Sequence, residues 1–208
     1  MAKPKQQRKL VPAYLFWAAA LVFIITATRA HVGDMPRWEY RLFIDIYHWP
    51  WWLTPAMFTI TLLGSTWMVI MLSAWLFIAR KTYLALTVVT IGITSYAVTE
   101  AMKHIVNRPR PYVLLPHVFS REWFASGLGF PSGHTAVTTA LGLVLFRYLP
   151  KDLRWLVPLW IVGVAISRIY LGVHAPLDVI GGFCVGLTLA YIFGQFEPWL
   201  KKQLGRSR

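Results

Sequence analysis

The sequence is poor in cysteine and in charged residues. It contains one cysteine among 208 residues, and only 14% of its residues are charged, against 57% that are hydrophobic. A single cysteine excludes an intramolecular disulfide, and the apolar surroundings of Cys184 favour a small packing residue over a reactive thiol. A soluble domain of this length would carry more charge. With neither an internal repeat nor a low-complexity segment, residues 1–208 are expected to form a single membrane domain.

Acidic residues are scarcer still. Eight Asp and Glu stand against 21 Lys and Arg, which gives a formal net charge of +13. Such an excess can indicate nucleic-acid binding, but the pattern of basic and aromatic residues typical of an RNA-binding module is missing. Nucleic acid is therefore not expected as a partner, and the basic excess needs another explanation.

Long apolar runs, in contrast, are abundant. Six of them approach the ~20 residues that an α-helix needs to cross a bilayer. They are Val11–Thr28, Pro55–Ala79, Thr82–Met102, Ser132–Leu149, Leu153–Leu171 and Leu177–Phe196. This pattern predicts an all-α, polytopic membrane protein with six transmembrane helices in a bundle. Between the first two runs, the Trp- and Tyr-rich stretch Trp38–Trp52 predicts an interfacial segment. The connection Lys103–Pro131 lacks helical periodicity and is expected to be an ordered or partly re-entrant loop.

The placement of the basic residues explains their excess. In a six-span arrangement, thirteen Lys and Arg fall on the side that holds both termini, and eight fall on the other side. By the positive-inside rule, both termini are then cytoplasmic and the protein lies in a cell membrane. The basic tails are expected to set the topology and to bind anionic lipids.

Three short strings hold the residues that can do chemistry. They are Lys103-(six residues)-Arg110-Pro111, Pro131-Ser132-Gly133-His134, and Ser167-Arg168-(five residues)-His174-(three residues)-Asp178. In the six-span arrangement all three fall on the extracytoplasmic face, as an active site built from them requires. The strings occupy residues 103–178, which we take as the core of the domain.

The cations of these strings suit a phosphate group. Lys103 offers a point charge, and Arg110 and Arg168 offer planar forks that match phosphate oxygens. Taken alone, the first string also fits a basic loop that touches lipid headgroups. Arg168 stands in an apolar run, where an unpartnered charge is costly, so it is a functional candidate. The overlapping Arg108-Pro109 pair offers a second register, but the spacing from Lys103 favours Arg110 and leaves Arg108 an accessory role at most.

The two histidines complete the set. Ser132 can cap a helix N-terminus that binds an anion, Gly133 lets the backbone approach a ligand, and His134 can then reach an ester oxygen. An ordinary cap followed by an interfacial His fits the second string equally well. In the third string, Asp178 can fix the tautomer of His174 and support its imidazolium, with His174 as the nucleophile. A purely structural His–Asp pair is the alternative.

Together the three strings resemble the tripartite signature of the type 2 phosphatidic acid phosphatase (PAP2) superfamily, in its membrane lipid phosphatase branch. The resemblance implies a hydrolase that needs no metal or other cofactor. It implies that His174 forms a phosphohistidine, that His134 protonates the leaving oxygen, and that Asp178 orients His174. The phosphate-binding residues that it implies are Lys103, Arg110, Ser132, Gly133 and Arg168.

The expected activity is hydrolysis of a phosphomonoester or diphosphate of an outer-leaflet lipid. Undecaprenyl diphosphate is the favoured substrate, followed by phosphatidylglycerophosphate and phosphatidic acid. A lipid phosphotransferase would share the first half-reaction, and a non-enzymatic transporter or binder of anionic lipids would share the cations. Binding alone does not need the His and Asp residues, which favours an enzyme. The Gly182-(three residues)-Gly186 face fits either helix packing within the chain or a homodimer.

Overall fold

The structure, a computed structural model, describes residues 10–123 and 125–205. Within these ranges the regular elements are all helical, as the sequence predicts. The helices are α1 (Ala13–His31), α2 (Arg37–Tyr47), α3 (Thr54–Leu62), α4 (Thr66–Ile78), α5 (Thr82–Val106), α6 (Pro111–Leu114), α7 (Gly133–Leu145), α8 (Leu156–Tyr170) and α9 (Pro176–Gly205), with single 3-10 turns η1 (Trp51–Leu53) and η2 (Lys151–Leu153). The basic stretches 1–9 and 206–208, on which part of the topology argument depends, lie outside the described residues.

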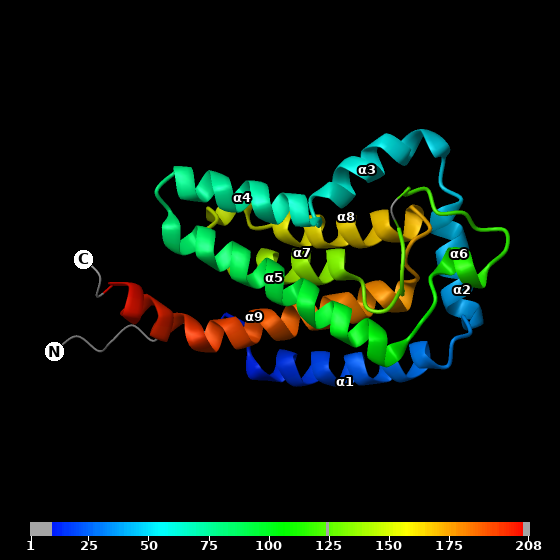
Figure 1. Cartoon of the computed structure of the whole chain (residues 1–208), viewed down its shortest axis with the longest axis horizontal. Coiled ribbons are helices and arrows are strands. Elements are labelled where there is room, and N and C mark those ends of the chain that lie inside the picture. Colours follow the sequence, from blue (N-terminus) through cyan, green and yellow to red (C-terminus); the bar gives the residue numbers. More distant parts are fainter. Residues whose placement is uncertain (1–9, 124, 206–208) are drawn as a thin grey trace.

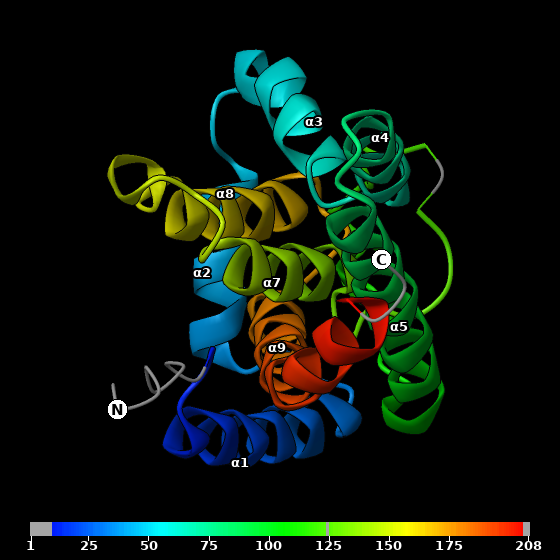
Figure 2. The ribbon, with the colours of Figure 1, turned by 90° about the vertical axis from the view of Figure 1, so that its left-hand side faces the viewer.

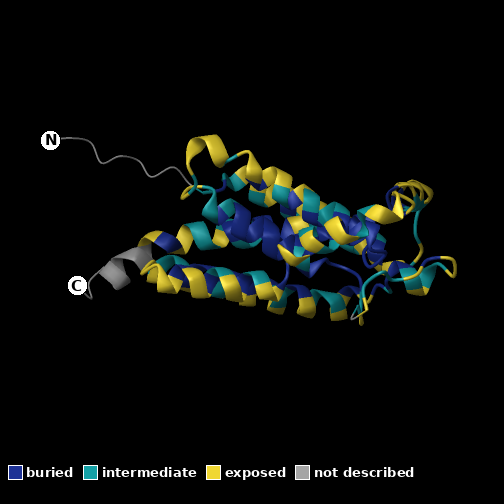
Figure 3. Cartoon of the chain, turned by 90° about the horizontal axis from the view of Figure 1, so that it is seen from above, coloured by how far each residue is buried: buried dark blue, intermediate teal, exposed yellow. Residues whose placement is uncertain are grey.

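Helix α7 forms the centre of the bundle. It packs against α5, α8 and α9, while α1 covers α9, α4 covers α5 and α3 covers α8 (Figure 2). The buried residues of the chain concentrate on this central helix and on the faces turned toward it (Figure 3). Five apolar side chains of α7 are wholly inaccessible to solvent, namely Ala136, Val137, Ala140, Leu141 and Val144. This apolar centre fixes where the N-terminus of α7, and with it the second string, is held.

Two glycines allow α9 to approach α7 closely. A Cβ atom at Gly182 would lie 2.4 Å from the backbone oxygen of Ser132, and one at Gly186 would lie 2.5 Å from that of Ala136. No side chain fits at such distances, so only glycine permits this helix contact. The Gly182–Gly186 face is therefore used for packing within the chain, and it is not free to bind a second copy.

The outward faces of the bundle are apolar. On α1, Trp17, Leu21 and Ile24 are each at least 60% exposed, and on α4, Trp67 and Met71 are exposed to a similar degree. Exposed apolar surface on this scale is not tolerated by a soluble monomer, whereas hydrocarbon covers it without cost. The bundle thus has the surface of a membrane protein.

The structure supports four or five membrane-spanning segments among the described residues, whereas the sequence predicts six. In the part of the chain that the structure describes, four helical stretches are long and apolar enough to cross a membrane: Ala13–His31, Thr82–Leu114, Lys151–Tyr170 and Pro176–Pro198. The stretch Pro55–Ala79 is not one straight helix, because η1 with α3 and then α4 meet at an angle of 51° and count at most as one bent span. Helix α7 has 13 residues, about 20 Å at 1.5 Å per residue, which is shorter than a hydrocarbon core of about 30 Å. Six spans remain a prediction.

The break between α3 and α4 has a local cause. Ser65 caps α4, since its hydroxyl accepts from the N–H of Met68 at 3.4 Å and donates to the oxygen of Leu62 at 2.7 Å. Gly64 lies so close to α7 and α8 that a Cβ atom would come within 2.8 Å of Thr138 and Val164. The neighbouring helices thus leave room for glycine alone at this turn.

The connections that carry the three strings gather at one end of the bundle. There the α5–α7 connection, α6 and the α8–α9 turn lie beside α2, while α1 begins and α9 ends at the opposite end (Figure 1). Helix α2 crosses this end and buries Phe43, Ile46 and Tyr47 against the bundle. The stretch predicted to be interfacial is therefore partly a packed cap, followed by the exposed Trp51 and Trp52. The shared end agrees with the prediction that the strings converge.

The expected loop Lys103–Pro131 begins later than predicted. Helix α5 continues through Val106 and ends at Asn107, whose φ of 53° is left-handed. Asn tolerates this conformation better than most residues, which makes it a suitable helix terminator. As a result, Lys103 lies on the last turn of a long helix and has a rigid support.

Candidate active site

The three strings form one pocket of about 160 Å³ at the end of the bundle. Six of the eight predicted site residues line it: Lys103 of α5, Arg110 just before α6, Gly133 and His134 of α7, Arg168 of α8 and His174 of the α8–α9 turn. The other two, Ser132 and Asp178, are wholly buried and stand outside the set of lining residues. Residues up to 71 positions apart in the chain are thus brought to one place.

Ser132 supports the pocket from the start of α7. It is the N-cap of this helix, where its hydroxyl accepts from the N–H of Thr135 at 3.5 Å and its own N–H donates to the backbone oxygen of Asp178 at 2.9 Å. The first bond stabilises the N-terminus of α7, and the second joins it to the first turn of α9. His134 lies on the first turn of α7 and lines the pocket. Ser132 itself hydrogen-bonds backbone groups.

His174 and Asp178 form the centre of the site. Nδ1 of His174 lies 3.5 Å from Oδ2 of Asp178, within ion-pair range but long for a hydrogen bond. Burial lowers the pKa of His174 well below its usual range, and the positive charges of Arg110, Arg168 and Lys103 lower it further. The imidazole is therefore neutral at physiological pH, which is the form that can attack phosphorus. With Nδ1 turned toward Asp178, Nε2 is the nitrogen left to react.

The two pocket arginines are held differently. Arg168, only 2% exposed, donates from Nη1 to Thr61 at 2.8 Å and from Nη2 to Oε2 of Glu122 at 2.7 Å. Its buried Nε finds no hydrogen-bond partner among the described residues. Within the described part of the chain, Arg110 donates to two backbone oxygens, those of Gly127 and Val173, both at 3.3 Å. Both guanidinium groups thus keep donor capacity for an anion in the pocket.

Lys103 lies at the rim of the pocket. Its ammonium group donates to Oε2 of Glu100 at 3.0 Å, one turn earlier on α5. Glu100 is 62% exposed, so this ion pair is weak and can exchange for a phosphate oxygen. The lysine is therefore available to a ligand.

Glu122 and Thr61 belong to the site although the sequence analysis did not identify them. Glu122 comes from the loop between α6 and α7 and lines the pocket, and Thr61 comes from the last turn of α3. Neither is part of a motif. Their only sequence signal is that an arginine in an apolar run requires partners, and that signal does not say where the partners are.

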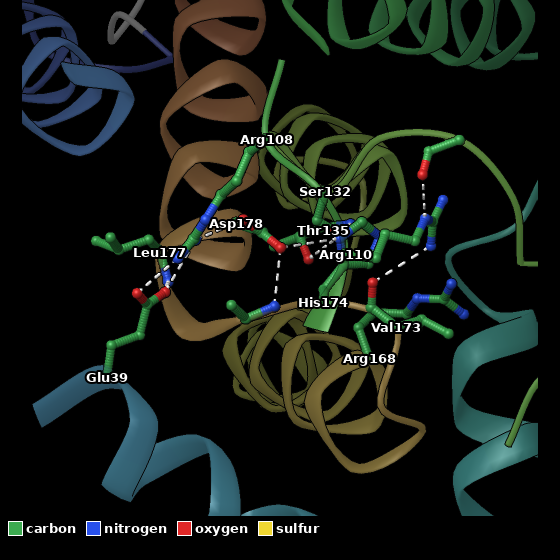
Figure 4. A network of polar contacts seen from close by, with 12 residues as sticks. Glu39, Arg108, Arg110, Ser132, Thr135, Arg168, Val173, His174, Leu177 and Asp178 are labelled. Atoms are coloured by element: carbon green, nitrogen blue, oxygen red, sulfur yellow. Dashed lines mark hydrogen bonds and ion pairs between the residues drawn. The ribbon is translucent and has the colours of Figure 1, made fainter. Parts of the chain in front are cut away.

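Arg108 lies behind the pocket and does not line it. It is wholly buried and donates from Nη1 to Oδ1 of Asp178 at 2.9 Å. The same guanidinium binds both oxygens of Glu39 on α2, at 3.0 and 2.7 Å (Figure 4). Spacing along the chain favours Arg110 over Arg108 as a phosphate ligand, and Arg110 lines the pocket. Spacing does not show that Arg108 pairs with Asp178.

The described residues contain no cluster of three or more His, Cys, Asp or Glu that could hold a metal ion. The groups that gather here are instead three cations, two imidazoles and a carboxylate behind one of them. Such a set can bind a tetrahedral anion, attack it with nitrogen and protonate a leaving oxygen.

Comparison with known proteins agrees with this chemistry. Residues 82–202 match the model of the PAP2 superfamily. The chain is 31% identical over 166 residues to phosphatidylglycerophosphatase B of Bacillus subtilis, covering 73% of this chain and 78% of that protein. It is 27% identical over 195 residues to an undecaprenyl-diphosphatase of Sulfolobus acidocaldarius, covering 88% and 92%.

Solved structures show the same fold. The crystal structure of a transmembrane PAP2-type phosphatidylglycerolphosphate phosphatase from Bacillus subtilis superposes with a TM-score of 0.75 at 27% identity, over 91% of this chain and 98% of that one. LpxE of Aquifex aeolicus superposes with a TM-score of 0.66 at 28% identity, over 79% and 98%. On the evidence of the family match, the relatives and the pocket that its three motifs build, this chain belongs to the PAP2 superfamily.

Proposed function

We propose that this protein is an integral membrane lipid phosphatase that works through a phosphohistidine at His174. The observation that carries the proposal is the arrangement of that imidazole: neutral, next to Asp178, and in one pocket with Lys103, Arg110 and Arg168. Three cations with a neutral nucleophile fit a phosphoryl transfer better than simple anion binding, which needs no nucleophile.

The proposed reaction has two steps. Nε2 of His174 attacks phosphorus, the bond from phosphorus to the ester or anhydride oxygen breaks, and His134 donates a proton to that leaving oxygen. Water then attacks the phosphohistidine, His134 accepts a proton from the water, and the P–N bond breaks to release inorganic phosphate. Lys103, Arg110 and Arg168 stabilise the charge on the transferring oxygens in both steps. Burial, and next the positive charge of Arg168, lower the pKa of His134 well below its usual range. For His134 to act as the acid, the negative charge of the bound phosphate must raise that pKa again.

The substrates we propose are lipid phosphates of the outer leaflet. Undecaprenyl diphosphate comes first, followed by phosphatidylglycerophosphate and phosphatidic acid. Support comes from the names of the relatives, one a phosphatidylglycerophosphatase and another an undecaprenyl-diphosphatase. The proposed topology has six spans, with both termini in the cytoplasm and the pocket outside. No metal is required in this mechanism, so a chelator should leave the rate unchanged.

A phosphotransferase remains the second candidate, because its first half-reaction would be identical. The test is a panel of these three lipids with purified protein in detergent micelles, without any acceptor lipid. We expect release of inorganic phosphate, fastest from undecaprenyl diphosphate. Turnover that appears only after a lipid acceptor is added would favour the transferase. Folded protein that binds the lipids but neither releases nor transfers phosphate would overturn the enzymatic proposal.

A further inference from the structure

Three ionic side chains are wholly buried behind the pocket. Glu39, Arg108 and Asp178 each have no solvent-exposed side-chain surface. Removing such groups from water costs several kcal/mol per ion unless each is paired and hydrogen-bonded. Asp178 already has the role of orienting His174, but nothing in the phosphoryl chemistry described above uses Glu39 or Arg108. Their burial therefore calls for an explanation.

The geometry links the three groups in a row. Nη1 of Arg108 is shared, since it donates to Oε1 of Glu39 at 3.0 Å and to Oδ1 of Asp178 at 2.9 Å. Nη2 of Arg108 donates to Oε2 of Glu39 at 2.7 Å, which makes the Arg108–Glu39 contact bidentate. A bidentate pair fixes the plane of the guanidinium, and so fixes the direction from which it meets Asp178.

The same network holds the backbone just before Asp178. Glu39 also accepts from the N–H of Leu177 at 2.9 Å, and Oδ2 of Asp178 accepts from the N–H of Ala175 at 2.8 Å. These are N–H groups at the start of α9, where a helix has unsatisfied donors and favours negative charge. Glu39 thus ties α2, far away in the sequence, to the turn that carries His174.

The network of Glu39, Arg108 and Asp178 also carries a net negative charge close to His174. A pair of Arg108 and Asp178 alone would be neutral, whereas the additional carboxylate of Glu39 leaves one net negative charge. The imidazole of His174 becomes positively charged when its nitrogen bonds to phosphorus. A buried negative charge close to that ring stabilises the charge as it develops, and water screens it little at this depth.

We propose that Glu39 and Arg108 are positioning residues, which hold Asp178 ionised and oriented against His174 and leave one negative charge behind the nucleophile. The inference rests on the proposed phosphatase function. It assigns a role to a residue of α2, outside the three motifs. Neither residue touches the pocket, and both act through Asp178.

The test compares Glu39→Gln with two controls on the same helix, using purified full-length protein and release of inorganic phosphate from the best lipid of the panel. Asp45→Asn removes an exposed acid of α2, and Phe43→Ala removes a wholly buried apolar side chain without changing charge. For each variant, kcat, KM, the melting temperature and the pH profile of kcat/KM are measured.

The pH profile is the decisive readout. The charged and titratable groups that face His174 from the surrounding elements are Tyr96, Lys103, Arg110, Glu122, His134, Arg168 and Asp178, and Glu39→Gln leaves all of them in place. With one negative charge fewer, the pKa of His174 falls, so the acidic limb of the profile moves to lower pH. We expect kcat to drop about 10- to 100-fold, because a group that orients the imidazole through Asp178 is lost, with KM changed less than about threefold.

A second variant keeps the proposal falsifiable if Glu39→Gln folds poorly. The double variant Glu39→Gln/Arg108→Gln removes one charge of each sign, so Asp178 alone leaves the net charge at its original value. Its acidic limb should lie at the wild-type position, although two hydrogen-bonding groups have been changed. An acidic limb clearly displaced from that of the wild type would overturn the charge argument.

The remaining outcomes are equally clear. If Glu39→Gln behaves like Phe43→Ala, with a lower melting temperature but an unchanged pH profile, the network is only structural and the proposal fails. Unchanged kcat in Glu39→Gln would also overturn it. A wild-type protein without phosphatase activity would instead refute the proposed function, which separates the two failures.

Discussion

Oδ2 of Asp178 lies 3.5 Å from Nδ1 of His174, and the same oxygen accepts from the backbone N–H of Ala175 at 2.8 Å. The backbone bond holds the carboxylate in place whether or not the imidazole is charged. The carboxylate of Asp178 is therefore already in place to stabilise the positive charge that develops on His174 during the reaction. The site is in this sense preorganised for the transition state.

His174→Ala should abolish turnover. Without the nucleophile the two-step reaction has no first step, so phosphate release should fall roughly 10⁴-fold or more. Incubation with ³²P-labelled lipid should also leave no acid-labile label on the protein. The control is His104→Ala, an exposed histidine near the end of α5, which should retain activity. Turnover that survives in His174→Ala would remove the nucleophile assignment.

The positive charges of the pocket should set the position of the acidic limb in the pH profile of kcat/KM. Burial and the nearby positive charges lower the pKa of His174 below its ordinary 6.5, so the acidic limb of kcat/KM should lie below about pH 6.5. Lys103→Met removes one of those charges, raises the pKa of His174 and should move the limb to higher pH. Lys81→Met, at the opposite end of α5, serves as the control. A limb that moves to lower pH in Lys103→Met would contradict this explanation.

Glu122→Gln should strengthen binding of inorganic phosphate. The carboxylate of Glu122 occupies Nη2 of Arg168 at 2.7 Å, so an incoming phosphate must compete with it for the same donor. Loss of the negative charge should lower the inhibition constant of phosphate by up to about fivefold, since partly exposed pairs are worth up to about 1 kcal/mol. Asp34→Asn, on the exposed loop after α1, should have no effect. Weaker inhibition in Glu122→Gln would show that Glu122 supports the ligand.

Gly186→Ala should destabilise the bundle. Its methyl group would lie 2.5 Å from the backbone oxygen of Ala136, so α7 and α9 must separate. Overpacking of this kind costs about 1–3 kcal/mol, which a melting curve in detergent detects. Gly163→Ala is the matched control, because its methyl group would meet only Ile60 at an ordinary 3.5 Å. The control should melt at the same temperature or higher, since Ala is the better helix former. Equal melting temperatures for both variants would refute the close α7–α9 contact.

Cysteine labelling should locate the pocket relative to the membrane. In a Cys184→Ala background, Val113→Cys on α6 should react with an impermeant maleimide added outside intact cells, because Val113 is 64% exposed at the pocket end. Asp152→Cys, in the exposed turn η2 between α7 and α8, should react only after the cells are permeabilised. The reverse pattern would place the pocket in the cytoplasm and overturn the topology inferred from the basic residues.

Local sequence signals predicted much of the site. The start of α7 is one example, because the sequence predicts Ser132 as a helix cap and Ser132 is the N-cap of α7. Such signals depend on a few neighbouring residues, so a single sequence reveals them. The broken α3–α4 stretch was not predicted, because apolar composition continues through it. Only the tertiary structure shows that α7 and α8 leave room for glycine alone at position 64.

The sequence by itself determined the family signature and the helical class, and it predicted that the three strings share one face of the membrane. Composition, motif spacing and helix ends depend on residues that are close together in the sequence, so a single sequence reveals them. Only the tertiary structure decided that Arg108 faces Asp178 and Glu39, which lie 70 and 69 positions away. The physical reason is that a buried charge requires a partner but does not specify which one. The partner is chosen by the packing of α2 across the end of the bundle.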